Sequence, residues 1–513
     1  MHTSVQRDVN RVELFTPEQT FGDLKGRTVR GGAVTFAAQA VKVVLNMGAT
    51  MLLARILTPK DFGLISMVTA VTGFVETFKD AGLSMATIQR EHITEVQVST
   101  LFWLNVALSA GLMLLVVALA PALAVFYHQP PLVWITVAIA STFLFGGLTV
   151  QHQALLRRNL RFKELAIIDI ISLAVGVATA IGMALAGFRY WSLVGMMVMS
   201  ALTNAIAVWI VLPWRPGRPQ RNCDIRPMIS FGGNIVACRF LFSFVGSAPT
   251  VLIGWYWGAG PVALYQKPYS LLTFAIDQIH GPVAAVALSP LSRVQSNLDR
   301  FRRYFLAGYS IVISFALPVA VVSAVFSEEI IRLLLGAQWM EAVGIFRWLA
   351  IAAVFVSLLN PLGMVLQATG RAARQVKLTV IDSALVIAAY SLALRFGPEA
   401  VAIGFVAVRA AIYLPMTYAM LKGTGIAFKE LLRTTLAPVI AVLLAALAGI
   451  LVKFWLHGTL NQFLVTFIGV CLTLSTYALI LLVVLGKWSF YRDILQELLP
   501  RSFLFPQAAN RGG

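Results

Sequence analysis

Four cationic residues lie inside long apolar runs of this sequence, where a charge is costly unless it has a partner or a use. They are Lys42, Arg239, Lys267 and Arg409. Arginine matches phosphate oxygens with its planar fork, and lysine offers a compact charge. We predict that these residues line a cationic cavity that binds an anionic ligand. Two alternatives stay open: a structural pair with an acidic neighbour, or a side chain that extends to the membrane interface.

Two carboxylates, Glu76 and Asp277, lie 201 positions apart inside or beside apolar runs. They are predicted to act as a coupling pair or as counter-charges for the cations, and a purely structural role stays open. Asp169 and Asp382 lie in the first two turns of predicted helices. A helix dipole favours carboxylates at that end, so a structural role is predicted for both.

The composition places these charges in a membrane protein. The chain has 513 residues, of which 59% are hydrophobic and 12% charged, whereas a soluble domain has about 25% charged residues. Apolar runs without period-2 alternation predict helices rather than a barrel. The fold class is therefore an all-α polytopic membrane protein. The three cysteines have no ligand spacing, so neither a metal site nor a disulfide framework is predicted.

The apolar runs predict fourteen spans of about 20 residues each. They lie near 31–53, 62–79, 99–120, 132–156, 165–187, 190–212, 229–256, 262–284, 304–326, 343–366, 376–395, 399–421, 435–456 and 463–485. With the N-terminus inside, 29 of the 40 Lys and Arg residues fall on the cytoplasmic side, seven on the opposite side and four within spans. This asymmetry predicts that both termini are cytoplasmic. The net charge of +18 is thus a topology signal and does not indicate nucleic acid.

An internal repeat organises the spans. Gly31-Gly32 and Gly232-Gly233 are 201 positions apart, and the extra residues of the second half fall around 327–342. There the pattern predicts a short helix in the outer interface, with Trp339 as its anchor. Two six-helix bundles related by a pseudo-two-fold along the membrane normal are expected, plus two C-terminal helices. The predicted parts are a tail at 1–30, bundles at 31–212 and 229–421, a linker at 213–228, accessory helices at 435–485 and a tail at 486–513.

Several short motifs resemble those of one transporter family. They are Ala54-Arg-Ile-Leu-Thr-Pro-Lys-Asp-Phe-Gly63, Asp80-Ala-Gly-Leu-Ser84 with Gln89-Arg90, Thr100-Leu-Phe-Trp-Leu-Asn105, Arg158-Asn-Leu-Arg-Phe162 and Leu335-Gly-Ala-Gln-Trp339. The chain resembles the Wzx-type polysaccharide flippases, which belong to the multidrug/oligosaccharidyl-lipid/polysaccharide (MATE-like) exporter superfamily. The resemblance covers roughly residues 25–485 and is most specific for colanic acid, succinoglycan and teichuronic acid exporters.

The resemblance implies a V-shaped MATE-like fold and a flippase activity in a bacterial inner membrane. The implied cargo is an undecaprenyl-diphosphate-linked oligosaccharide used for exopolysaccharide or lipopolysaccharide biosynthesis. Alternating access would be coupled to an ion, H⁺ or Na⁺, without a further cofactor. Implied partners are the lipid-linked oligosaccharide, membrane lipids, and a polysaccharide polymerase with its export machinery.

Two other classes of function are compatible with a polytopic membrane protein. A multidrug or organic-ion antiporter of the same superfamily is the alternative function, but the deepest charges here, Lys42 and Arg409, favour an anionic cargo. An enzyme is not predicted, because the chain has no G-x-x-x-x-G-K-[ST] motif and no nucleophile with a positioned base.

Overall fold

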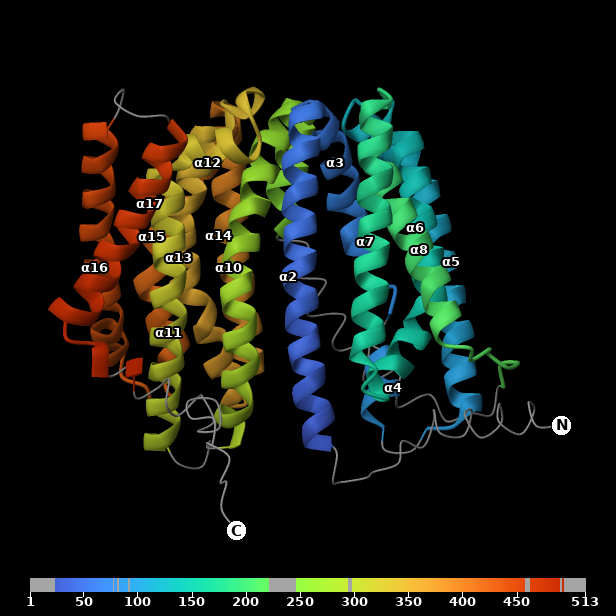
Figure 1. Cartoon of the computed structure of the whole chain (residues 1–513), viewed down its shortest axis with the longest axis horizontal. Coiled ribbons are helices and arrows are strands. Elements are labelled where there is room, and N and C mark those ends of the chain that lie inside the picture. The colour runs from blue at the N-terminus through green and yellow to red at the C-terminus, as the bar shows by residue number, and fades with distance from the viewer. Residues whose placement is uncertain are drawn as a thin grey trace, which may run out of the picture. The chain divides into compact units, whose positions relative to one another are not determined.

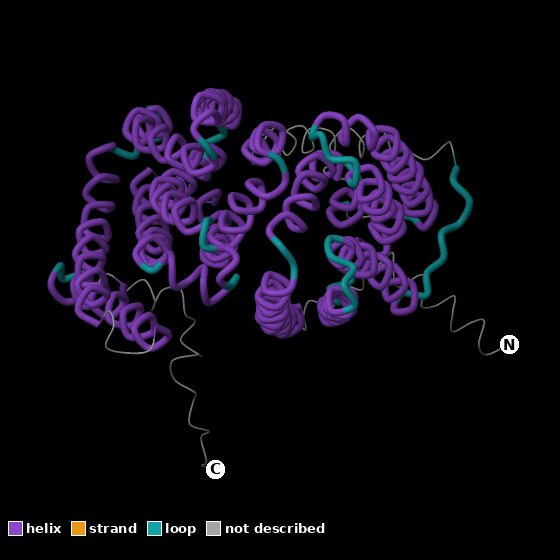
Figure 2. Tube along the Cα trace, turned by 90° about the horizontal axis from the view of Figure 1, so that it is seen from above, coloured by secondary structure: helices purple, strands orange, loops and turns teal. Residues whose placement is uncertain are grey.

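The structure is a computed structural model. It describes residues 24–76, 78–80, 83–90, 93–220, 246–293, 298–456, 462–489 and 491–492. Every regular element in these ranges is a helix, as the tube in Figure 2 shows. The described part of the chain therefore confirms the all-α class.

The chain divides into two compact units. The first comprises the described residues of Met1–Gln266 with Leu334–Gln338, and the second those of Lys267–Leu333 with Trp339–Gly513. The helices of the first unit are α2 (Leu24–Ile56), α3 (Pro59–Glu76), α4 (Leu83–Gln89), α5 (Glu95–Phe126), α6 (Leu132–Arg158), α7 (Phe162–Leu185) and α8 (Trp191–Val211) (Figure 1). The domain bounds expected from the sequence stay a prediction, and much of the 213–228 linker lies outside the described residues.

The second unit holds most of α10, which begins in the first. Its helices are α10 (Ala259–Arg293), α11 (Leu298–Val325), α12 (Ser327–Leu334), α13 (Ala342–Ala368), α14 (Ala372–Ala393), α15 (Pro398–Leu421), α16 (Phe428–Leu456) and α17 (Gln462–Leu479). Short turns of 3₁₀-helix lie at Ala337–Trp339 and Leu394–Phe396, and α17 ends in a π-helical turn at Ile480–Val484.

Eleven helices in the described residues are long and apolar enough to cross a membrane. They match eleven of the fourteen predicted spans. Two further predicted spans are helical, α3 and α10, but are not among the eleven. Most of the predicted span 229–256 lies outside the described residues. Its described part is helical, over residues 246–257. The count of fourteen stays a prediction.

The same helix pairings occur inside both units. In the first unit α5 packs on α6, α6 on α8, and α7 on α8; in the second α11 packs on α13, α13 on α15, and α14 on α15. These are the pairs that a six-span repeat makes equivalent, so the packing supports the repeat. The axis between the halves stays a prediction. Outside the repeat, α16 packs on α11 and on α17.

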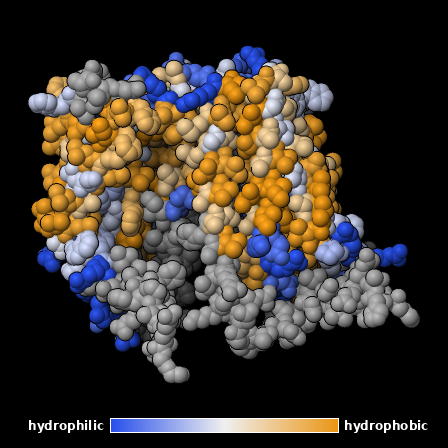
Figure 3. Space-filling model, viewed as in Figure 1, coloured by the Kyte–Doolittle hydropathy of each residue, from blue (hydrophilic) through white to orange (hydrophobic). Residues whose placement is uncertain are grey.

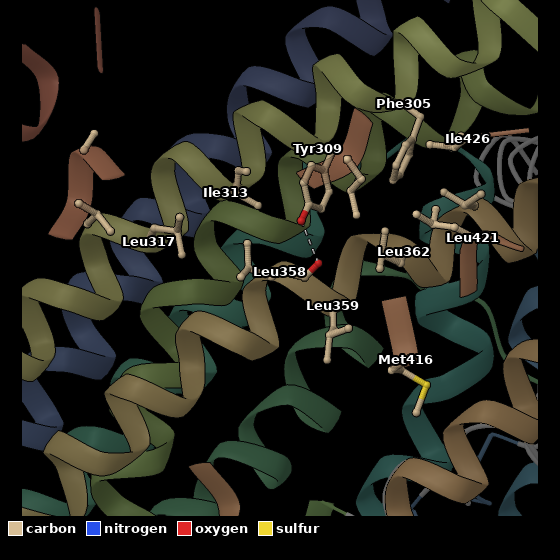
Figure 4. Close-up of a cluster of buried hydrophobic side chains, with 14 of the residues drawn as sticks. Phe305, Tyr309, Ile313, Leu317, Leu358, Leu359, Leu362, Met416, Leu421 and Ile426 are labelled. Atoms are coloured by element: carbon tan, nitrogen blue, oxygen red, sulfur yellow. Dashed lines mark hydrogen bonds between the residues drawn. The ribbon is translucent and has the colours of Figure 1, made fainter. Parts of the chain in front are cut away.

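The core of the second unit is built from long apolar faces of α11, α13 and α16. Figure 4 shows Phe305, Tyr309 and Ile313 meeting Leu358 and Leu362. The Tyr309 hydroxyl donates to the Leu358 carbonyl at 3.3 Å, which gives this buried polar atom a partner. On the outside, apolar side chains cover the flanks of the helices and hydrophilic ones gather at their ends (Figure 3), as a bilayer-spanning helix requires.

The short helix predicted at 327–339 is present as α12, and its position in the outer interface stays a prediction. The predicted role of Trp339 as its anchor is wrong. Trp339 is fully buried and so is not an interfacial side chain. The helix is held instead by Glu329, whose carboxylate lies 2.7 Å from Lys453 of α16. Arg347 of α13 donates to the Ser327 hydroxyl at 3.2 Å. Both contacts lie within the second unit, and they fix α12 to the helix bundle.

Candidate functional site

A charge pair lies between two long helices of the first unit. Lys42 of α2 donates to the Asp169 carboxylate of α7 at 3.0 Å. The two helices pack along each other, which brings these residues together across 127 positions. The Lys42 side chain is 32% exposed and the Asp169 side chain 41% exposed, so the surrounding helices do not enclose the pair.

A second charge pair lies in the second unit and is more deeply placed. Arg409 of α15 donates to the Asp382 carboxylate of α14 at 2.5 Å. Only 15% and 20% of these side chains are exposed. The guanidinium carbon of Arg409 also lies 5.0 Å from the centre of the Phe405 ring, a distance at which the ring quadrupole attracts a cation.

The carboxylates of the two pairs lie on equivalent helices of the repeat, but the cations do not. Asp169 and Asp382 lie on α7 and α14, which the repeat makes equivalent, whereas the cations come from α2 and α15. Both acids lie beyond the second turn of their helices, so helix-end capping does not account for them. Sequence reasoning named these acids but did not predict that they pair with Lys42 and Arg409.

Among the described residues, the other predicted site residues, Glu76, Asp277 and Lys267, belong to neither charge pair. Glu76 is the last residue of α3 and pairs with Lys79 at 2.9 Å, on an exposed surface. Asp277 is an exposed residue of α10, and Lys267 is half-buried near the start of the same helix.

Arg239 lies outside the described residues. The site predictions thus stay predictions, with a new feature: each of the two deepest cations already has a carboxylate partner. A phosphate oxygen can replace a carboxylate oxygen on either cation, because both are anionic acceptors of the same hydrogen bonds. Each pair is therefore suited to an exchange in which an anionic ligand replaces the carboxylate as the partner of Lys42 or Arg409.

Replacing Lys42 by glutamine should separate the two roles of the first pair. Because both side chains keep about a third or more of their exposure, the loss of stability should be less than about 1 kcal/mol. If the chain exports a polymer precursor, as the resemblance implies, and Lys42 contacts that cargo, export should nevertheless fall at least tenfold. Export and thermal melting would be measured on the same variant, and normal export would remove Lys42 from the site.

The motifs that carry the family resemblance fasten helix ends. Arg158, at the end of α6, donates to the Thr87 carbonyl at 3.0 Å and to the Arg90 carbonyl, which directly follows α4.

Two other motif residues hold the start of α4 and the segment after α8. Asp80 accepts from the Ser84 backbone N–H at 2.8 Å and so stabilises the start of α4. In α5, Trp103 donates to the Gly217 carbonyl at 2.9 Å and fixes the segment after α8. These residues build the first unit and lie outside both charge pairs.

Two further motifs contact each other at the end of α2. The Gln338 amide donates to the carbonyls of Ala54 and Leu57, the latter at 2.9 Å. Thr58 and Asp61 then cap α3, with the Thr58 backbone N–H donating to the Asp61 carboxylate at 2.9 Å. One side chain from the 335–339 motif thus satisfies helix-end carbonyls that would lack partners.

Replacing Gln338 by leucine should leave these two carbonyls without their donor. An unsatisfied buried polar group costs about 1–3 kcal/mol, so we expect a lower melting temperature. Gln367→Leu is the matched control, since Gln367 is exposed and its side chain forms no hydrogen bond among the described residues. Equal melting temperatures for both variants would contradict the role given to Gln338.

Residues 52–344, more than half of the chain, match the family model described as polysaccharide biosynthesis protein. The chain belongs to this family. Among its relatives is teichuronic acid biosynthesis protein TuaB of Bacillus subtilis, 30% identical over 328 residues, which are 63% of this chain and 67% of TuaB. Lipopolysaccharide biosynthesis protein WzxC of Escherichia coli K12 is 22% identical over 393 residues, 75% of this chain and 79% of WzxC.

Solved structures show the same fold in two kinds of transporter. The lipid II flippase MurJ, in an inward closed conformation, matches with a TM-score of 0.71 and 13% identity, over 90% of this chain and all of MurJ. An inward-facing multidrug resistance MATE transporter of the MOP superfamily matches with a TM-score of 0.57 and 14% identity, over 74% of this chain and 95% of that chain. This polysaccharide biosynthesis protein therefore has the MurJ- and MATE-like fold.

Proposed function

We propose that this protein is a flippase for an acidic, lipid-linked oligosaccharide. The cargo would be a repeat unit on undecaprenyl diphosphate, moved from the cytoplasmic to the outer leaflet of a bacterial inner membrane. The observation that carries the proposal is the membership of the polysaccharide biosynthesis family together with the MurJ-like fold. Export of this cargo would serve exopolysaccharide or lipopolysaccharide biosynthesis.

The physical problem is the hydrated head of such a cargo. Taking charged phosphates across about 30 Å of hydrocarbon without replacement of their hydration costs far more than thermal energy. Lys42 and Arg409 can supply replacement hydrogen bonds at membrane depth once their carboxylate partners give way. We infer that the cargo enters by this exchange, with H⁺ or Na⁺ as the coupling ion.

The topology supports the direction of transport. The excess of Lys and Arg on one side of the predicted spans favours cytoplasmic termini, and we infer that the cargo is loaded from that side. No chemical step is assigned to the protein, and the proposal is transport alone.

Deleting the gene tests the proposal directly. We expect undecaprenyl-linked repeat units to accumulate in the cytoplasmic leaflet, while surface polymer is lost. Lipid extracts analysed by mass spectrometry would show the accumulation, and the intact gene supplied in trans should reverse it. If no such lipid accumulated and the cells instead became sensitive to cationic dyes, the multidrug antiporter of the same fold would be favoured.

A further inference from the structure

A cavity of about 730 Å³ lies in the second unit, apart from both charge pairs. It is formed by the first half of α11, the first half of α16 and the segment that follows α17. Neither α14 nor α15, which carry Asp382 and Arg409, contributes to its lining. It therefore requires an explanation separate from the proposed cargo site.

Four basic residues from three elements line this cavity: Arg300, Arg303, Arg433 and Lys487. The described residues of its lining include no carboxylate. The side chains of Arg303 and Arg433 form no hydrogen bond or ion pair with the residues that the structure describes. The adjacent Arg302 differs, because it is paired with Glu430 at 2.6 Å. Two guanidinium groups from different helices are thus left to face one open cavity.

The cavity also has an apolar wall and a fixed side. Leu306 of α11, Pro438 of α16 and Leu481 supply the apolar surface. On the other side the Tyr491 hydroxyl lies 3.1 Å from the Ser310 hydroxyl oxygen and 2.5 Å from that of Ser314. These hydrogen bonds hold the segment after α17 against α11, so the cavity is bounded by ordered residues.

We propose that this cavity binds the head of an anionic phospholipid from the cytoplasmic leaflet. Arg303 and Arg433 bind the phosphodiester, and an acyl chain lies along Leu306 and Leu481. The charge argues for this occupant, since basic pockets between spanning helices on the cytoplasmic side attract phosphate head groups. The apolar wall argues for a lipid over a free anion, because a soluble phosphate gains nothing from it. The inference does not rest on the proposed transport function.

The position gives the site a mechanical consequence. The lipid would contact α11, α16 and the segment after α17 at the same time. Of these, α11 belongs to the six-span repeat, whereas α16 and the segment after α17 lie outside it. Binding would therefore hold the two C-terminal helices to α11, together with the Tyr491 hydrogen bonds.

The test is lipid binding by the purified full chain in detergent. Native mass spectrometry would count bound phosphatidylglycerol, with phosphatidylcholine as the zwitterionic comparison. The double variant Arg303→Gln/Arg433→Gln should bind phosphatidylglycerol at least tenfold more weakly. The matched control is Lys377→Gln/Lys422→Gln, which removes the same charge from exposed cytoplasmic positions outside the cavity and should bind like the parent.

Three results would overturn the proposal. The first is unchanged binding in the arginine variant, and the second is an equal loss in the lysine control, which would indicate a non-specific charge effect. The third is full competition by inorganic phosphate or pyrophosphate, which would make this a free-anion site. Elution of each variant as a monodisperse peak shows that it is folded, and since transport is not measured, failure of the flippase proposal would leave the result intact.

Discussion

Replacing Arg409 by glutamine is expected to abolish polymer export and to destabilise the second unit. The change leaves the Asp382 carboxylate, which is only 20% exposed, without its cation. Removing one partner of a buried pair costs about 3 kcal/mol or more. Surface polymer in cells and the melting temperature of the purified protein would both be measured.

A second variant separates stability from transport. Arg409→Gln/Asp382→Asn removes both charges while keeping the two side chains close to their original size, so most of the lost stability should return. Export should still be absent, because the cation that meets the phosphate is missing. If the double variant exports polymer normally, the pair is structural and Arg409 is not a cargo contact.

Replacing Gly63 by alanine should prevent normal folding of the first unit. A Cβ atom at this position would overlap the backbone carbonyl of Ala259, where α3 meets the start of α10. Neither backbone can yield cheaply, because Gly63 and Ala259 are both buried. Overpacking typically costs about 1–3 kcal/mol and occasionally more, and a clash with backbone atoms belongs at the upper end of that range. Loss of the monodisperse peak in size-exclusion chromatography is the expected readout.

Gly73, ten residues further along α3, provides the control for that experiment. A Cβ at Gly73 meets no atom within 4 Å, so Gly73→Ala should be neutral or stabilising by up to about 1 kcal/mol. Equal behaviour of the two alanine variants would show that the contact with Ala259 does not restrict position 63.

Much of the architecture was predictable from the sequence because membrane spans are a property of local composition. Span positions such as 132–156 and 399–421 fall within α6 and α15, since twenty consecutive apolar residues have no other stable arrangement in a bilayer. The repeat was visible in the same pattern, and the helix pairings support it.

The contacts were not predictable, because they depend on which helix faces meet. Nothing local in the sequence states that Lys42 faces Asp169 across 127 residues, or that Arg409 faces Asp382 and not Asp277.

The pattern around Trp339 suggested an interfacial anchor, whereas tertiary packing buries this side chain completely. The motif residues Arg158 and Gln338 bind main-chain carbonyls, which every residue carries, so no sequence signal could name their acceptors.

The neutrality of the two charge pairs has a consequence for the energetics of transport. When Arg409 and Asp382 move together, they carry no net charge through the electric field of the membrane. One elementary charge crossing 100 mV is worth about 2.3 kcal/mol. In the proposed transport, the voltage then acts on the coupling ion and on the phosphates and acidic sugars of the cargo, and an interior-negative potential drives these anionic groups outward. Each additional acidic sugar in the repeat unit would make export more sensitive to depolarisation of the cell.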